Sequence, residues 1–184
     1  FTVSDYVKET LVNRVGYNRN QLFTTYLGID TEYYEFDSVD VDLELPDNYL
    51  LHVSNQSPIK NVGTLIDGFN KFVDDFPNYH LVITGRGWES SLQEKCIKYG
   101  IEDKVTFLGY IGSIKKLISL YDGAKLYIQP SIHETFGRPI IEAMTRGTPV
   151  LTSKRCALNE VAGESATLIN DPNSGLEMAN KMGN

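Results

Sequence analysis

The residues Tyr49-Leu50-Leu51-His52-Val53, followed after a polar loop by residues 62–76, are the most informative part of the sequence about the fold. The first part is an apolar run of strand length. In the second part apolar side chains recur at the spacing of one helix face, at Val62, Leu65, Ile66, Phe69, Phe72, Val73 and Phe76. A buried strand followed by an amphipathic helix is the repeating unit of a parallel sheet.

The same alternation continues toward the C-terminus. We expect further strands at residues 80–84, 104–108, 124–129, 149–152 and 166–169. Helices are expected at residues 89–99 and 113–121, from Pro139, near 159–162 and from Ser174. Short apolar strands separated by helices predict an α/β fold with a doubly wound, Rossmann-like parallel sheet covered on both faces. In such a sheet a ligand binds at the carboxyl ends of the strands.

Residues 1–47 lack this alternation. We expect a helix that begins after Ser4 and ends at Gly16, a strand at residues 21–26 and a turn at residues 27–30. Residues 31–47 are acidic and aromatic without periodicity, and we expect a connector that runs over the surface. The chain begins at Phe1 rather than Met and ends within a new helix, so we expect a piece of a longer protein.

Composition excludes several functional classes. The net charge is -7 and there is no run of Lys or Arg, which argues against a nucleic-acid partner. No apolar run approaches the roughly 20 residues that span a bilayer. Cys96 and Cys156 have no metal-binding or redox spacing, and we expect free thiols in a reducing compartment. A serine-hydrolase elbow and a zinc-ligand cluster are also missing from the sequence.

Two glutamates, Glu134 and Glu142, stand eight positions apart with Phe136-Gly137-Arg138-Pro139 between them. Pro139 fits the first position of a helix, whose free N–H groups then form a site for phosphate. Carboxylates repel phosphate, so the acids make sense if they face hydroxyl groups. A sugar nucleotide offers both hydroxyls and phosphates. The alternative is a pair of exposed surface acids.

Three other predicted strands end in residues suited to the same ligand. Lys60, after the first strand, is either a point charge for a diphosphate or a solvated lysine. Gly85-Arg86-Gly87, after the second, either lets the backbone approach a ligand or forms a simple turn. Between Gly109 and Gly112, the backbone of Tyr110 or Ile111 either reaches the edge of a base or forms a tight turn. Because these ends converge on one rim, we favour the binding interpretation.

Two histidines need separate interpretations. His133 adjoins Glu134, which suggests an acid-base pair, but neighbouring loop residues usually point apart. His52 lies within a predicted strand, and we expect a packed core histidine.

The residues around Glu134 resemble the E-x7-E signature of retaining glycosyltransferases of the GT-B type, known as group 1 or family 4. The matching pieces occur in the family's order: Pro130-Ser131, Glu134-x-Phe136-Gly137-x-Pro139, Glu142-Ala143-Met144 and Gly147-x-Pro149-Val150. The family has two Rossmann-like domains. The resemblance implies that residues 48–184 are the second, donor-binding domain, truncated at its C-terminus, and that residues 1–47 are the end of the acceptor domain with the connector.

The resemblance also implies roles for individual residues. Glu134 is implied as the catalytic residue that holds sugar hydroxyls near the reacting carbon, and Glu142 as the ligand of the ribose. The other implied donor contacts are the Lys60 charge on the diphosphate and the backbone of Ile111, Phe136 and Gly137.

One position departs from the family pattern. Asn55 stands where the family usually has an arginine. Either Arg86 or Arg138 is expected to supply the missing charge, or the donor is expected to bind less tightly.

The implied function is transfer of a hexose-type sugar, with retention, from a nucleotide-diphosphate sugar to a glycan, lipid or other acceptor. No cofactor or metal is expected. The expected location is the cytoplasm, with peripheral membrane contact left open, and this chain alone is expected to be inactive. Two alternatives remain: a nucleotide-sugar binding module without transfer activity, and a sugar-nucleotide epimerase of the same fold.

Overall fold

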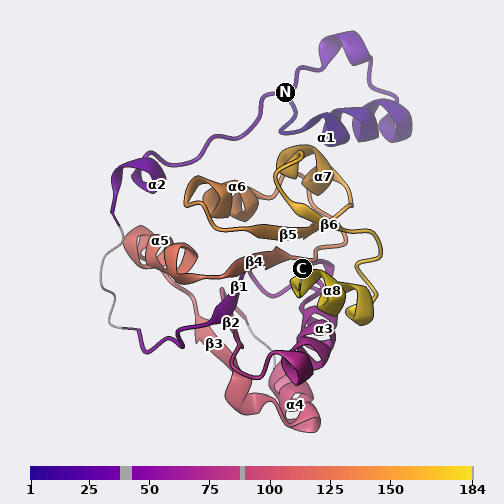
Figure 1. Ribbon diagram of the computed structural model, residues 1–184. Helices are drawn as coiled ribbons and strands as arrows, with labels where there is room; N and C mark the ends of the chain where they lie inside the picture. The colour runs from indigo at the N-terminus through magenta and orange to yellow at the C-terminus, as the bar shows by residue number, and fades with distance from the viewer. Residues whose placement is uncertain (38–42, 88–89, 184) are drawn as a thin grey trace.

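The computed structural model describes residues 1–37, 43–87 and 90–183, and its centre is a six-stranded parallel sheet (Figure 1). The strands are β1 (Tyr49–Val53), β2 (His80–Thr84), β3 (Val105–Gly109), β4 (Leu126–Gln129), β5 (Val150–Ser153) and β6 (Thr167–Ile169). Their order is β3-β2-β1-β4-β5-β6. The chain winds outward from β1 to β3, returns to β4 beside β1 and winds outward again. The predicted doubly wound α/β fold is therefore confirmed.

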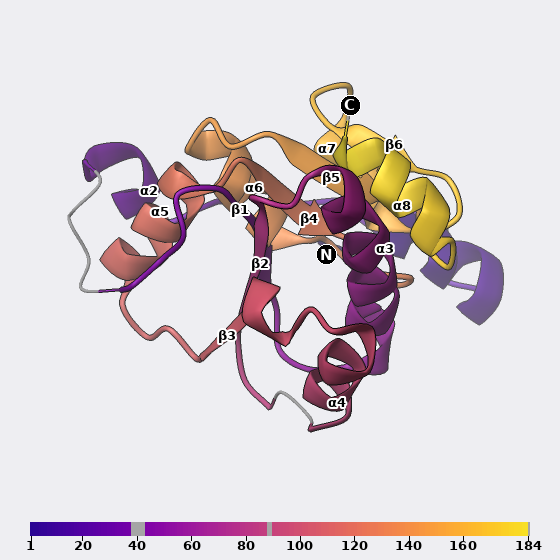
Figure 2. The ribbon, with the colours of Figure 1, turned by 60° about the horizontal axis from the view of Figure 1, so that its bottom comes forward.

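Helices cover both faces of the sheet (Figure 2). One face carries α3 (Val62–Asp75), α4 (Ser90–Tyr99) and α8 (Gly175–Met182). The opposite face carries α5 (Ile114–Gly123), α6 (Arg138–Thr145) and α7 (Ala157–Ala162). These helices and the six strands confirm the predicted alternation to within a few residues. The predicted start of α4 at Glu89 lies outside the described residues.

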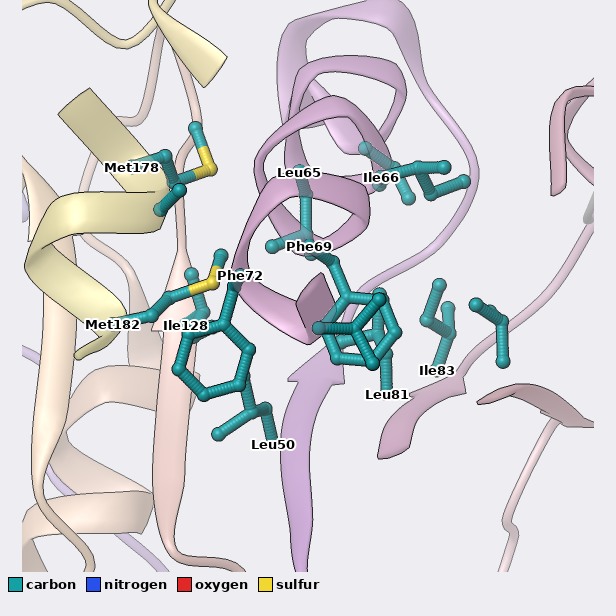
Figure 3. Packing of buried hydrophobic residues seen from close by; sticks show 14 of the residues in the cluster. Leu50, Leu65, Ile66, Phe69, Phe72, Leu81, Ile83, Ile128, Met178 and Met182 are labelled. Atoms are coloured by element: carbon teal, nitrogen blue, oxygen red, sulfur yellow. The ribbon is translucent and has the colours of Figure 1, made fainter. Parts of the chain in front are cut away.

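The core forms two apolar layers because successive strand residues point to opposite faces of the sheet. Leu50 belongs to the layer beneath α3, and Leu51 belongs to the layer beneath α5 and α6. In the first layer, shown in Figure 3, the α3 side chains lie against strand residues and two methionines of α8: Leu65, Phe69, Phe72, Leu50, Leu81, Ile128, Met178 and Met182. Burial of each such side chain contributes about 2 kcal/mol to folding. The packed layer therefore fixes the positions of the strands and of the loops that follow them.

The predicted helix after Ser4 is confirmed as α1 (Asp5–Thr10), continued by a π-helical turn at Leu11–Val15. The Ser4 hydroxyl accepts a hydrogen bond from the N–H of Val7, which caps the helix. Gly16 ends the π-helical turn in the left-handed conformation.

The predicted strand at residues 21–26 is wrong. Arg19–Gln21 form a 3-10 turn, and a single parallel bridge joins Thr24 to Thr2. The residue types favour a strand, but a strand needs a partner. Within the described part of the chain, this segment pairs only at Thr2. The predicted turn at residues 27–30 is also wrong, because Gly28 does not adopt a positive φ and these residues form no turn.

The surface connector predicted for residues 31–47 is wrong in one part. A short helix, α2 (Glu32–Glu35), buries Tyr33 to 2% exposure, with its ring 6.3 Å from that of Tyr121 on α5. One buried aromatic on a four-residue helix produces no periodicity in the sequence. Residues 38–42 of this connector lie outside the described part of the chain.

His52 confirms the prediction of a packed core histidine. It is fully buried in β1, with Nδ1 2.7 Å from the carbonyl oxygen of Ile128 and Nε2 2.8 Å from the hydroxyl of Ser54. The carbonyl can only accept, so the neutral ring carries its proton on Nδ1. Burial lowers the pKa of His52 to about 4.

We expect His52 to make folding sensitive to acid. In the unfolded chain a histidine has a pKa near 6.5. Between that pH and the lower pKa of the folded state, the unfolded chain binds a proton at His52 and the folded chain does not. Between pH 6.5 and 4 the free energy of unfolding should fall by about 3 kcal/mol from this group alone. Urea titrations across this range should show a shallower pH dependence for His52→Gln than for the parent, with His133→Gln as the control. Parallel pH profiles for the parent and His52→Gln would contradict this expectation.

Candidate active site

The carboxyl ends of β1 to β4 meet at one edge of the sheet, as the sequence predicts. The ends of β1 and β2 are in register at Val53 and Thr84, and Thr84 in turn is paired with Gly109 of β3. Backbone hydrogen bonds continue beyond the strands, from the N–H of Ser54 to Thr84 and from the N–H of Gly85 to Gly109. The loops that carry the predicted site residues are therefore connected to one another.

Glu134 and Lys60 form an ion pair at this edge. The Nζ of Lys60 donates to Oε1 of Glu134 at 2.5 Å, and the side chains are 18% and 11% exposed respectively. The same oxygen accepts from Nε2 of Gln129 at 2.9 Å and from the hydroxyl of Ser131 at 3.1 Å. Lys60 is thus a partly buried partner of Glu134, and the alternative of a solvated lysine is wrong.

Two of these partners were missed at the sequence level. Gln129 and Ser131 follow the apolar residues of β4, and both are buried to 1% exposure or less. A polar side chain at the end of an otherwise apolar strand was the available signal. Buried polar side chains need hydrogen-bond partners, and Glu134 provides one for each.

The loop after Glu134 leads into the N-terminus of α6. Gly137 is the N-cap residue with φ of 102°, and an added Cβ there would lie 2.7 Å from Cδ2 of Leu158. Glycine is therefore required at this turn. Phe136 is buried, and its ring lies 6.3 Å from that of Tyr26. The buried ring leaves the backbone of Phe136 as the part of this residue to which the family resemblance assigns a ligand contact, and that contact stays a prediction.

Glu142 is nearly buried, at 7% exposure, so the alternative of two exposed surface acids is wrong. The hydroxyl of Tyr121 donates to its Oε2 at 2.9 Å, and Nε of Arg138 lies 3.6 Å from Oε1. Burial raises the pKa of the Glu142 carboxyl, while hydrogen bonds from Tyr121 and Tyr33 and the Arg138 charge oppose the rise. Burial also holds the pKa of Tyr121 well above its usual value, so its hydroxyl remains a donor.

A cavity of about 460 Å³ lies beside Glu142, between the N-terminal ends of α5 and α6. We call it the α5–α6 cavity. It brings together three predicted site residues, Ile111, Arg138 and Glu142, with two residues of the N-terminal segment, Asp30 and Tyr33. Neither residue was predicted as part of a site, because Asp30 lies in the turn predicted at residues 27–30 and Tyr33 in the surface connector predicted at residues 31–47.

The two candidate arginines differ in their partners. Arg138 is paired with Asp30 at 2.8 Å and lies near Glu142, so its charge is already matched. Arg86 stacks its guanidinium on the ring of Tyr110, 4.0 Å from the centroid, and among the described residues no carboxylate pairs with it. Asn55 is exposed in the loop after β1. Arg86 is thus the candidate whose charge remains available to an anion.

Gly85 also has a structural role. An added Cβ at Gly85 would lie 1.6 Å from the carbonyl oxygen of Ser54, so this glycine permits contact between two loops. Its contact with a ligand stays a prediction.

His133 is directed away from Glu134, as expected for adjacent loop residues. Its ring lies 6.0 Å from that of Tyr6, and its Nδ1 is 3.4 Å from the Sγ of Cys156. Cys96 and Cys156 are both free thiols, as predicted.

Within the described residues, no group of three or more His, Cys, Asp or Glu side chains could hold a metal ion. Two further acidic residues, in the triplet Asp40-Val41-Asp42, lie outside the described residues and are not covered by this statement about metal binding. No helix in the described ranges has the length and apolar character to cross a membrane.

The fold and the site together define a class: an α/β domain with paired acids, a lysine and a helix N-terminus at the carboxyl edge of its sheet. Residues 35–182 match the family described as Glycosyl transferases group 1, and the chain belongs to this family. Its sheet and helices match those of solved GT-B glycosyltransferases.

Two curated relatives are mannosyltransferases by name. O-antigen chain mannosyltransferase B of Escherichia coli is 30% identical over 94% of this chain and 47% of its own length. O-antigen chain mannosyltransferase RfbU of Salmonella typhimurium is 31% identical over 92% of this chain and 46% of its own length. The chain thus spans about half the length of the curated relatives it matches.

Among solved structures, Anabaena Alr3699/HepE in complex with UDP and glucose superposes with a TM-score of 0.86 at 25% identity. The match covers 97% of this chain and 51% of that one. WaaG, a glycosyltransferase involved in lipopolysaccharide biosynthesis, gives a TM-score of 0.85 at 19% identity, over 98% of this chain and 51% of its own. The WaaG match supports the fold alone.

Proposed function

We propose that this chain is the donor-binding part of a glycosyltransferase that moves a hexose-type sugar from a nucleotide-diphosphate sugar to an acceptor, with retention of anomeric configuration. The observation that carries the proposal is the Lys60–Glu134 ion pair beside the α6 N-terminus, next to a cavity that contains Glu142. The names of the mannosyltransferase relatives and the UDP and glucose named with HepE support the ligand class.

The ion pair resolves the conflict between acidic residues and a phosphate ligand. A lone carboxylate at the α6 N-terminus would repel a diphosphate. The Lys60 ammonium, 2.5 Å from the carboxylate, offsets that negative charge. A diphosphate can then approach the lysine and the helix N-terminus, while Glu134 remains available to sugar hydroxyls.

The α5–α6 cavity suits the nucleoside. In the proposed arrangement Glu142 accepts from ribose hydroxyls, because Tyr121 and Arg138 already fix its orientation. The backbone of Ile111, at the cavity wall, meets the edge of the base. Asn55 and the backbone of Gly85 lie along the neighbouring loops and complete the donor contacts.

Arg86 is the proposed substitute for the arginine that Asn55 replaces. Arg138 faces two carboxylates, Asp30 and Glu142, whereas Lys60 faces one, so Arg138 attracts a phosphate less strongly. Arg86 is exposed and stacks on an aromatic ring, which leaves its guanidinium edge free for bidentate contact with phosphate.

The proposed mechanism stabilises a leaving diphosphate and uses neither a metal nor a cofactor. Negative charge develops on the diphosphate oxygens as the bond between the sugar and the diphosphate breaks. This charge would be stabilised by Lys60, Arg86 and the α6 N-terminus. The acceptor hydroxyl would attack from the face that the diphosphate leaves, and its proton would pass to an oxygen of the departing diphosphate. The two-carboxylate route of glycosidases is not proposed, because it requires both acids to flank one bond and Glu142 is assigned to the ribose.

Product stereochemistry tests the proposal. The full-length gene product should release nucleoside diphosphate only when an acceptor is present, and NMR of the new glycosidic bond should show the donor's anomeric configuration. Inverted product would contradict retention. Acceptor-independent release together with an epimerised sugar would favour the epimerase alternative. Binding without any release would favour the binding module.

A further inference from the structure

A chain of buried polar side chains leads from β4 to Glu134. Tyr127 is fully buried, and its hydroxyl lies 2.8 Å from Oε1 of Gln129. Gln129 is 1% exposed, and its Nε2 lies 2.9 Å from Oε1 of Glu134. The chain thus connects the core of the sheet to the proposed catalytic carboxylate.

The direction of these hydrogen bonds follows from the donors available. The Glu134 oxygen already accepts from Lys60, so Gln129 must present its NH₂ group to it. The amide oxygen of Gln129 then faces Tyr127 and accepts the tyrosine proton. The other acceptor near the Tyr127 hydroxyl is the carbonyl oxygen of Val53, which is farther away at 3.5 Å.

A polar chain at this place needs an explanation, because β4 lies in the middle of the sheet. An apolar side chain at position 129 would bury itself at no polar cost, whereas a buried amide is tolerated only with its hydrogen bonds made. Fully bonded networks of this kind rigidify the groups at their ends. The group at the end of this one is Glu134.

The consequence is an asymmetric carboxylate. Lys60, Gln129 and Ser131 all donate to Oε1 of Glu134. Among the residues that the structure describes, none donates to Oε2. One oxygen is therefore occupied by the protein, and the other is the oxygen that a ligand can reach.

We propose that Gln129 is a positioning residue of the donor site. It orients Glu134 so that Oε2 accepts from one hydroxyl of the transferred sugar. This assignment rests on the proposed function and adds the residue that fixes the sugar-recognising oxygen. A carboxylate held in one orientation discriminates between sugars that differ in the direction of that hydroxyl.

The test compares nucleoside diphosphates with their sugar conjugates. Calorimetry compares UDP with UDP-glucose, and GDP with GDP-mannose. For the nucleotide that binds, we call the affinity for the sugar conjugate divided by the affinity for the nucleoside diphosphate the sugar factor. In Gln129→Leu this factor should fall by about tenfold, the effect of losing one hydrogen bond to a charged group. Affinity for the nucleoside diphosphate itself should stay within about threefold, since Lys60 is still present.

Thr152→Val is the matched control. The Thr152 hydroxyl donates to the backbone carbonyl of Gln129 at 2.9 Å and is equally buried. This nearly isosteric change removes a hydrogen bond to the same residue without touching the amide side chain. It should lower the thermal midpoint and leave the sugar factor unchanged.

Gln129→Glu provides a second readout that a purely structural role would not produce. The introduced carboxyl would face Oε1 of Glu134, and two adjacent carboxylates share a proton. The sugar factor should then depend on pH, and it should rise toward the parent value as the pH falls from 8 to 5, roughly the range in which coupled carboxyls titrate. This variant also serves if Gln129→Leu fails to fold.

The outcomes separate the two proposals. If neither nucleoside diphosphate binds the parent chain, the proposed function and the Gln129 assignment both fail. Two other outcomes contradict only the Gln129 assignment. In the first, a nucleoside diphosphate binds but the sugar factor of the parent is close to one. In the second, the sugar factor is unchanged in folded Gln129→Leu and independent of pH in Gln129→Glu.

Discussion

Replacing Gly85 by alanine should destabilise the chain by about 3 kcal/mol or more, which lowers the thermal midpoint by about 10 °C in a domain of this size. Two causes add. The φ of Gly85 is +142°, a conformation that a residue with a side chain rarely adopts. The new Cβ would also lie 1.6 Å from the carbonyl oxygen and 2.5 Å from the carbonyl carbon of Ser54.

The clash cannot be relieved cheaply, because backbone hydrogen bonds hold both sides of it. Ser54 donates to Thr84, and Gly85 donates to Gly109. Moving either loop would therefore break the register at the carboxyl edge of the sheet. Site residues on both loops, Asn55 and Arg86 among them, would shift with it.

Gly109→Ala is the control that separates the two causes. Gly109 also has a positive φ, of 68°, but no atom lies within 4 Å of its added Cβ. The Gly109→Ala variant should lose only about 1 kcal/mol of unfolding free energy, the cost of a left-handed backbone conformation in a residue with a side chain. Equal losses in urea unfolding for the two alanine variants would show that the contact with Ser54 does not constrain Gly85.

Replacing Glu134 should give the largest loss of activity. In the full-length gene product, Glu134→Gln should lower transfer by about 10²- to 10³-fold, the usual effect of removing one preorganised electrostatic contact to the transition state. The glutamine is nearly isosteric, but it removes the negative charge beside the sugar carbon, which becomes positively charged as the diphosphate leaves. Initial rates of acceptor glycosylation measure the loss.

Donor affinity should move differently. Glu134→Gln releases Lys60 from its ion pair, so its charge becomes fully available to a diphosphate. Nucleoside diphosphate should bind the variant as tightly as the parent or more tightly. Glu164→Gln, at an exposed acid away from this edge, is the control for loss of one negative charge. A parallel loss of transfer and nucleoside diphosphate affinity would contradict the role assigned to Glu134.

The fold was largely predictable because its strands and helices carry strong local patterns. The apolar spacing along α3 fixes which helix face meets the sheet, and the structure places the predicted residues from Val62 to Val73 in the core. Phe76 was predicted on the same face, but it follows the last residue of α3 and is 39% exposed. The short helix α2 was missed because its single buried residue, Tyr33, has no periodic neighbour. The strand predicted at residues 21–26 failed because pairing depends on partners that a local pattern does not reveal.

The candidate site was predictable only as far as topology allows. The rule that parallel strands end at one edge brought Lys60 and Glu134 together, although 74 positions separate them. The same rule does not reveal that they form an ion pair, or that Arg138 is already paired with Asp30. Gln129 was missed because a polar residue within a strand acquires meaning only once its hydrogen-bond partners are known.

Donor binding at the carboxyl edge of the sheet can be tested by calorimetric titration of this chain with UDP and with GDP, for the parent and for Lys60→Ala. We expect the parent to bind at least one of them in a one-to-one complex. Lys60→Ala should bind that nucleotide at least about tenfold more weakly, because a charge-assisted contact to the diphosphate is lost. Absence of binding to the parent, or equal affinities for the parent and Lys60→Ala, would contradict the claim that this edge of the sheet binds a nucleotide-sugar donor.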